Sequence, residues 1–181
     1  MVVGPDMNSV AQESAPHPTV LQREPLGTGH AVAAAKPALG TIGGTVLVLF
    51  GDAPFVGAET RKRLAQRREG SDQPAVVVLG VRPEDPGGYG RLVTDARGNL
   101  ERIVEQRDAT SDELEIDLCN SGVMAVDGAM LWPLVDAIEN NNAKSEYYLT
   151  DIVAIAQSKG RSVAVVEADE DEIPLIGVND R

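Results

Sequence analysis

The segment VLVLFGDAPF, residues 46–55, ends an apolar run with a carboxylate: five apolar residues are followed by Gly51 and Asp52. Ligands of open α/β sheets gather outside the carboxyl ends of the strands. A carboxylate there is costly unless it is hydrogen-bonded or bound to a cation. Mg²⁺ suits the place, because it commonly takes one or two protein ligands and completes its shell with phosphates and water. Asp52 is therefore a candidate metal ligand, and the capping of a helix that follows Pro54 is an equally good interpretation.

The segment PLGTGHA, residues 25–31, predicts a second ligand-facing loop. Glycines on both sides of Thr28 allow a ligand close to the backbone, and free N–H groups at a helix start can hold polar ligand atoms. Thr28 is also a plausible N-cap of the alanine-rich helix that follows. A plain helix entry remains the simpler interpretation, with His30 as a packed or surface residue.

Three further segments hold polar side chains near predicted strands. The GGYGR segment, residues 87–91, predicts a tight turn where glycine admits a bulky ring against the backbone. Glu105, at the end of a strand, can accept hydrogen bonds from sugar hydroxyls, or it forms an exposed ion pair with Arg107 worth about 0–1 kcal/mol. Asn120, in mid-strand, either contacts a ligand or is a satisfied core amide.

The predicted elements that position these residues alternate between strands and helices, which is typical of a layered α/β domain with a mainly parallel sheet. The apolar run at 45–50 predicts a fully buried strand. One hairpin, over 90–106, is expected to lie off the main sheet. The other predicted strands are 1–3, 19–22, 74–81, 117–126 and 162–168, and the main predicted helices are 27–39, 58–70, 129–142 and 147–160.

Composition limits the class of protein. The 181 residues suit one domain, residues 1–181, and 43% of them are hydrophobic, as in globular proteins. A net charge of −12 argues against nucleic acid as a partner. No apolar run approaches the roughly 20 residues of a membrane span, and the first residues lack the features of a secretory signal. The single cysteine, Cys119, is interpreted as a packing residue and fits a reducing cytoplasm.

Taken together, these segments resemble one family. LQREPLGTGHA, LFGDAPF, GYGR, IVEQRDA, NSG, NNNAKSEYYLTD and GVNDR occur in the order and rough spacing of bacterial N-acetylglucosamine-1-phosphate uridylyltransferases. In that family the domain is the N-terminal half of a bifunctional enzyme. The resemblance runs over essentially the whole chain and implies a Rossmann-like nucleotidyltransferase fold.

The resemblance implies attack of N-acetylglucosamine 1-phosphate on the α-phosphate of UTP, giving UDP-N-acetylglucosamine for cell-wall synthesis, and pyrophosphate. It implies that Asp52 and Asn179 hold Mg²⁺. Phe50 and Gly51 are expected in the substrate site beside Asp52. By the same resemblance, Gln22, Gly27 and Thr28 contact the uracil, and Gly90, Glu105, Asn120 and Thr150 hold the acetylated sugar.

The sequence also departs from the family. Phe50 replaces a tyrosine, which removes one possible hydrogen bond. The first strand and the glycine-rich phosphate loop of the family have no counterpart here, nor has the acetyltransferase half. Loss of even one transition-state donor can cost about 10²–10³ in rate, so little turnover is expected. Strands next to the missing one would lack a neighbour, which favours self-association. A non-catalytic fragment that binds nucleotide sugar weakly, and a guanylyl or molybdenum-cofactor nucleotidyltransferase, are the alternatives.

Overall fold

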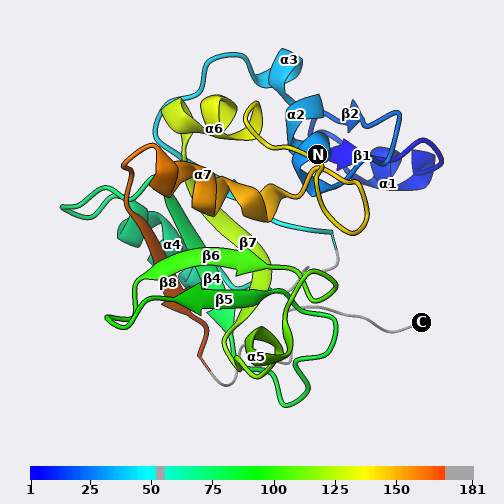
Figure 1. The fold of residues 1–181 in the computed structure, drawn as a ribbon. Coiled ribbons are helices and arrows are strands. Elements are labelled where there is room, and N and C mark those ends of the chain that lie inside the picture. The colour runs from blue at the N-terminus through cyan, green and yellow to red at the C-terminus, as the bar shows by residue number, and fades with distance from the viewer. Residues whose placement is uncertain (52–55, 170–181) are drawn as a thin grey trace.

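A computed structural model describes residues 1–51 and 56–169. It contains a six-stranded mixed sheet covered by helices on both faces, and a separate pair of short strands at the N-terminus (Figure 1). The strands of the large sheet lie in the order β6-β5-β7-β4-β8, and β3 pairs with β7 as well. Their bounds are β3 Thr45–Val48, β4 Val76–Val81, β5 Arg91–Thr94, β6 Leu100–Val104, β7 Cys119–Asp127 and β8 Val163–Glu167.

The expectation of an α/β sheet flanked by helices is confirmed, but the mainly parallel pairing is wrong. β4 pairs with β8 in parallel, from Val76↔Val163 to Gly80↔Glu167. β7 runs antiparallel to β3, to β4 and to β5. The strands β3, β4 and β8 do point the same way, so the hydrophobic runs predicted their direction correctly. The long strand β7, which opposes them, supplies the antiparallel neighbour.

The predicted hairpin is present as β5 and β6, paired from Arg91↔Val104 to Thr94↔Leu100. Its turn is held by Asp95, whose carboxylate accepts hydrogen bonds from the backbone N–H groups of Arg97 and Asn99, both at 2.8 Å. The hairpin does not lie off the main sheet, as the sequence predicted. It joins β7 through the pair Arg91↔Cys119, which brings the end of β6 next to the middle of the sheet.

The core lies on both faces of β4 and β7, because alternate strand residues point to opposite faces. Val76 and Val78 belong to the cluster under α6 and α7, while Val77 and Leu79 pack on the opposite face with Leu64 of α4. The helices that cover the sheet are α4 Ala58–Arg68, α6 Gly128–Val135 and α7 Ile152–Ser158. A short 3-10 helix, η1 Leu149–Asp151, precedes α7. The short α5 Ser111–Leu114 follows the hairpin.

The N-terminal segment forms a lobe beside the sheet (Figure 1). Its two strands, β1 Val2–Val3 and β2 Val20–Leu21, pair in parallel, with α1 Asn8–Glu13 between them. Two helices then lead to β3: α2 Thr28–Ala34 and α3 Lys36–Leu39.

Two local expectations are corrected in this region. Thr28 is the first helical residue and not the N-cap of α2, which is Gly27. Residues of β3 are only partly buried, although their continuous apolar run predicted a fully buried strand. Among the described strands β3 pairs only with β7, so its other edge has no strand beside it. No helix in the described part of the chain is long and apolar enough to cross a membrane.

Candidate functional site

Six of the residues predicted to bind substrate line one cavity of about 260 Å³. They come from six different places in the chain: the start of α2, the segment after β3, the turn before β5, the segment after β6, strand β7 and helix η1. Segments up to about 120 residues apart in sequence therefore meet here. The six residues are Thr28, Phe50, Gly90, Glu105, Asn120 and Thr150.

Gln22 and Gly27 lie next to this cavity, at the loop that ends in Thr28. The Gln22 side chain donates a hydrogen bond from Nε2 to the carbonyl oxygen of Gly27 at 3.1 Å, and Nε2 lies 3.0 Å from Nδ1 of His30. Because Nε2 is occupied in this way, the glutamine side chain is held against the loop. The three residues expected to contact a base are thus brought together in the structure.

Gly27 occupies a position that requires glycine. Its φ is +112°, and a Cβ there would lie 2.6 Å from the carbonyl oxygen of Tyr147. The same stretch of chain is tied to the loop by hydrogen bonds from Gly29 N–H to the Tyr147 oxygen and from Tyr147 N–H to the Leu26 oxygen, both 2.8 Å. Thr28 contributes through its hydroxyl, which accepts from Leu149 N–H at 2.9 Å.

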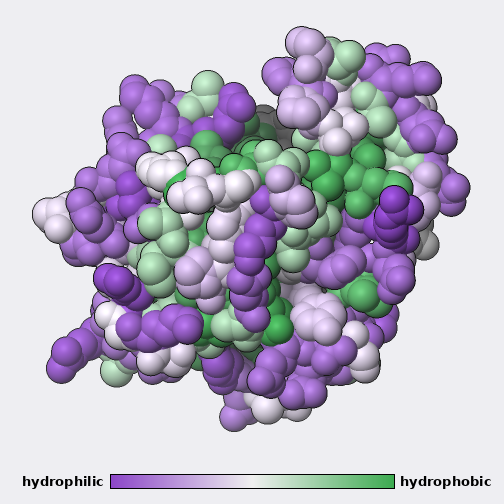
Figure 2. Space-filling view, turned by 90° about the horizontal axis from the view of Figure 1, so that it is seen from above, coloured by the Kyte–Doolittle hydropathy of each residue, from purple (hydrophilic) through white to green (hydrophobic). Residues whose placement is uncertain are grey.

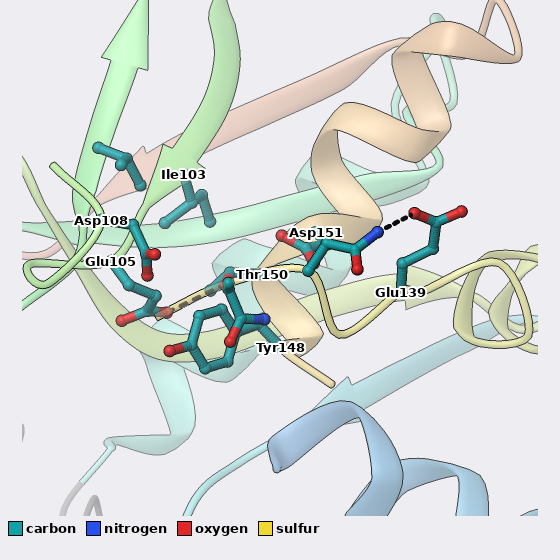
Figure 3. Close-up of a pocket in the computed structure, with 10 residues that line it drawn as sticks. Ile103, Glu105, Asp108, Glu139, Tyr148, Thr150 and Asp151 are labelled. Carbon is teal, nitrogen blue, oxygen red and sulfur yellow. Dashed lines mark hydrogen bonds between the residues drawn. The ribbon is translucent and has the colours of Figure 1, made fainter. Parts of the chain in front are cut away.

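Glu105 and Thr150 form the polar centre of the site (Figure 3). The Thr150 hydroxyl donates to Oε1 of Glu105 at 3.0 Å. Burial raises the pKa of the Glu105 carboxyl, although the Thr150 hydrogen bond and the positive charge of Lys144 act in the opposite direction. A partly desolvated carboxylate with one oxygen already bonded is able to accept a strong hydrogen bond from a ligand hydroxyl on the other.

Gly90 and Asn120 place a second polar group against this carboxylate. The carbonyl of Gly90 accepts from the backbone N–H of Asn120 at 2.8 Å. A Cβ on Gly90 would lie 3.5 Å from Oε2 of Glu105, so glycine keeps this oxygen accessible. Asn120 accepts from Gly122 N–H through Oδ1 at 3.1 Å, which orients the side-chain amide at the cavity wall.

Phe50 forms the opposite wall and explains another glycine. Gly122 has a φ of +83°, and a Cβ there would lie 2.6 Å from the Phe50 ring. The expectation that Phe50 lies in the substrate site agrees with this position. Gly51 follows it directly in the chain but is not among the residues that line the cavity.

The sequence analysis missed three lining residues, Tyr148, Lys144 and Glu146. Tyr148 is only 8% exposed, and its hydroxyl has no hydrogen-bond partner in the described structure. In Figure 3 its ring lies beside the Glu105–Thr150 pair and its hydroxyl points to the side of the Glu105 carboxylate. The polar and aromatic segment NNNAKSEYYLTD was the available signal, but nothing in it distinguishes Tyr148 from Tyr147.

A second cavity of about 320 Å³ adjoins the first and shares Glu105, Tyr148 and Thr150 with it. It is strongly acidic, because Asp108, Glu139 and Asp151 also line it (Figure 3). Burial first, and then the charges of Glu105 and Asp108, raise the pKa of the Asp151 carboxyl to about 6. The negative field behind Glu105 therefore disfavours additional anions on this side of the site.

The predicted metal ligands Asp52 and Asn179 lie outside the described residues. Within residues 1–51 and 56–169, no group of three or more histidine, cysteine, aspartate or glutamate side chains is arranged to hold a metal ion. The metal assignment therefore stays a prediction that depends on the donor types of these two residues.

Comparisons with known proteins identify the family. A profile of the nucleotidyl transferase family matches residues 10–171. The chain is 56% identical over 181 residues to the bifunctional protein GlmU of Paramagnetospirillum magneticum, and 57% identical over 181 residues to that of Rhodospirillum rubrum. Each match covers 100% of this chain and 40% of the relative. The chain thus spans about two fifths of the length of these curated relatives.

A solved structure supports the fold. The chain resembles a UDP-glucose pyrophosphorylase crystallised with UDP-glucose, with a TM-score of 0.64 and 15% identity, over 81% of this chain and 56% of the other. At this identity the likeness concerns the fold alone. The family profile and the GlmU relatives carry the assignment: the chain belongs to the nucleotidyl transferase family.

Proposed function

We propose that the site serves uridylyl transfer from UTP to N-acetylglucosamine 1-phosphate. The observation that carries this proposal is the convergence of six predicted contact residues on one cavity, with the uracil-contact loop at its side. The reaction forms a bond between a phosphate oxygen of the sugar phosphate and the α-phosphorus of UTP. The bond from that phosphorus to the bridging oxygen breaks, and pyrophosphate leaves.

The cavity contains groups of the kind that bind a sugar with an amide substituent. Glu105 accepts from a hydroxyl, while the Asn120 amide and the buried Tyr148 hydroxyl are able to donate. Tyr148 is buried without a partner in the described structure, and such a group is costly until a ligand satisfies it. Phe50 and the glycines at 90 and 122 provide a close, partly apolar surface for the ring and its acetyl group.

The loop of Gln22, Gly27 and Thr28 is proposed to bind the uracil. Gln22 Nε2 is engaged with Gly27, which leaves the amide oxygen of Gln22 to accept from the N3–H of the base. Thr28 begins α2, so its backbone N–H is among those that lack an intrahelical acceptor and is available for a carbonyl oxygen of the base. A base with a different edge, such as guanine, would fit this combination poorly.

Asp52 and Asn179 are proposed to bind Mg²⁺, because a carboxylate and an amide oxygen are donor types that this ion takes. When bound, the ion would neutralise phosphate charge, which a protein of net charge −12 requires. The residues of the cavity have a separate task, which is to hold the sugar phosphate in line with the α-phosphate.

Two measurements test the proposal. Calorimetry with UDP-N-acetylglucosamine and with GDP-mannose measures recognition, and release of pyrophosphate from UTP and N-acetylglucosamine 1-phosphate measures turnover. Saturable binding of the uridine sugar and weaker binding of the guanosine sugar support the proposed site. Binding without turnover would favour the alternative of a nucleotide-sugar-binding fragment. Absence of both at millimolar ligand would refute the assignment of substrates.

A further inference from the structure

An apolar groove lies on the other side of α2, away from the proposed substrate contacts. Its volume is about 300 Å³, and it runs between the β1–β2 pair, the helices α2 and α3, strand β3 and helix α6. Figure 2 shows hydrophobic residues gathered where the lobe that contains β1 and β2 meets the rest of the molecule. No charged side chain lines the groove in the described structure: its walls are Met1, Val2, Pro18, Val20, Val32, Ala35, Ala38, Leu39, Val46, Leu47, Val48, Leu49, Leu131 and Trp132.

Two open strand edges belong to this groove. Among the described strands, β1 pairs only with β2 and β3 pairs only with β7. Residues of both β1 and β3 line the groove, at Val2 and at 46–48. In a strand with one neighbour, every second residue directs its N–H and C=O away from that neighbour. Unpaired backbone groups of this kind are a template for a further strand.

The apolar surface here is larger than a surface strand needs. The run at residues 46–49 reads as a buried strand, yet β3 is only partly buried, and Leu49 is 41% exposed. Leu39, at the end of α3 on the rim of the groove, is 54% exposed. A continuous apolar run with an unpaired edge is typical of a strand that has neighbours on both sides.

We propose that the groove binds one extended, uncharged, apolar polypeptide strand that is additional to these 181 residues. Backbone donors and acceptors at β1 and β3 select an extended peptide, because a lipid or small apolar ligand would leave them unsatisfied. The walls select small or β-branched apolar side chains. The curated relatives contain much more chain than the matched part, since 181 residues cover 40% of their length.

A second copy of this chain is a poorer occupant. The β3 edge is recessed, because β1 and α3 line the same groove opposite it. Two such edges could pair with each other only if each β1 lobe moved away from its own groove. A single strand meets no such obstacle, and it would connect the two-stranded pair to the six-stranded sheet.

The test is a titration of the 181-residue chain with the peptide acetyl-Lys-Val-Ala-Val-Ala-Val-Lys-amide. Chemical-shift mapping and amide hydrogen exchange follow residues 45–49. We expect saturable binding, and exchange at alternate amides of β3 slowed by at least about tenfold. A peptide with alternate N-methylated amides should bind at least about tenfold more weakly, because it loses the donors that would pair with a strand edge.

A pair of leucine variants provides the matched control. Leu39→Asp places a charge on the rim of the groove and should weaken peptide binding by about tenfold or more. Leu114→Asp changes another partly exposed leucine, in α5 outside the groove, and should leave binding unchanged. Failure to bind, or equal binding of the N-methylated peptide, would overturn the proposal. A mass that rises with protein concentration, together with protection of β3, would instead assign the edge to a second copy. None of these readouts depends on nucleotide binding, so the proposal and the proposed function can fail separately.

Discussion

Replacing Glu105 with glutamine should change ligand affinity and stability in opposite directions. The amide has nearly the shape of the carboxylate and is able to keep the hydrogen bond from the Thr150 hydroxyl, which is 3.0 Å long in the native chain. The change therefore removes one charge and little else. Because burial raises the pKa of the Glu105 carboxyl, its ionised form is disfavoured in the folded state.

The loss of affinity follows from the free oxygen of this carboxylate. Thr150 occupies Oε1, and Gly90 leaves Oε2 accessible, so one ligand hydroxyl is expected to pair with the charge. A hydrogen bond to a charged group contributes about 1.5–3 kcal/mol and a neutral one about 0.5–1.5 kcal/mol. The difference of about 1–2 kcal/mol corresponds to roughly 5–30-fold weaker binding of UDP-N-acetylglucosamine.

The stability effect has a defined sign with pH. A carboxyl whose pKa is raised on folding costs nothing below its unfolded pKa, and its cost grows as the pH rises through the folded pKa. Glu105→Gln should therefore raise the midpoint of thermal unfolding at pH 7–8, with the gain disappearing in acid. Calorimetry measures the affinity, and thermal unfolding at several pH values measures the stability. Glu101→Gln is the control, because Glu101 is an exposed residue on the same β6 strand.

Either of two results would refute this reasoning. If Glu105→Gln binds the nucleotide sugar as tightly as the native chain, the carboxylate does not contact the ligand. If both affinity and stability fall at neutral pH, the charge is stabilised in the native fold by contacts that the geometry does not contain. An equal effect of Glu101→Gln would indicate that net charge alone decides the affinity.

Three further changes test the positions around the site by thermal unfolding, where about 1 kcal/mol corresponds to roughly 2–4 °C for a chain of this size. Gly27→Ala should cost at least about 2 kcal/mol, because it combines a φ of +112° with a Cβ 2.6 Å from the Tyr147 oxygen; an unchanged midpoint would show that the loop relaxes freely. Asp151→Asn should stabilise the chain by about 1–2 kcal/mol at pH 7.5, after allowance for solvent screening, and by nothing at pH 3.5, since the pKa of this carboxyl is about 6 against an ordinary value of 3.8; equal gains at both pH values would contradict the assignment. Thr110→Ala removes the N-cap of α5, where Thr110 and Glu113 form a capping box, and should cost about 1 kcal/mol; Thr110→Ser, which retains the hydroxyl, is its control.

The hydrophobic pattern predicted the elements better than their neighbours. The runs at 74–81 and 117–126 became β4 and β7, and the charged helix ended near Gly70 as expected. Strand direction and pairing are different properties, because an apolar run indicates burial on two faces and carries no information about which strand lies beside it. The antiparallel position of β7 was therefore not predictable from the runs alone, although the short hairpin that precedes it was.

The burial of β3 was mispredicted for a related reason. Its run of apolar residues is suited to a strand with neighbours on both edges and with both faces covered. In the described structure one edge is open, and the strand is only partly buried. Side-chain type predicts the environment that a segment favours, while the elements actually beside it decide whether that environment is reached.

The site itself was more predictable than the sheet, because its residues lie at loops whose glycines have specific tasks. Gly27 admits the Tyr147 backbone, Gly90 leaves Glu105 accessible, and Gly122 admits the Phe50 ring. Each glycine thus permits a contact between segments distant in sequence, and together these contacts bring Glu105 and Thr150 to one cavity. Tyr148 escaped prediction because its role depends on burial without a partner, a property that only the assembled structure displays. The polar group that the fold leaves unsatisfied is accordingly the one whose removal, as Tyr148→Phe, should stabilise the free chain and weaken its hold on a sugar ligand.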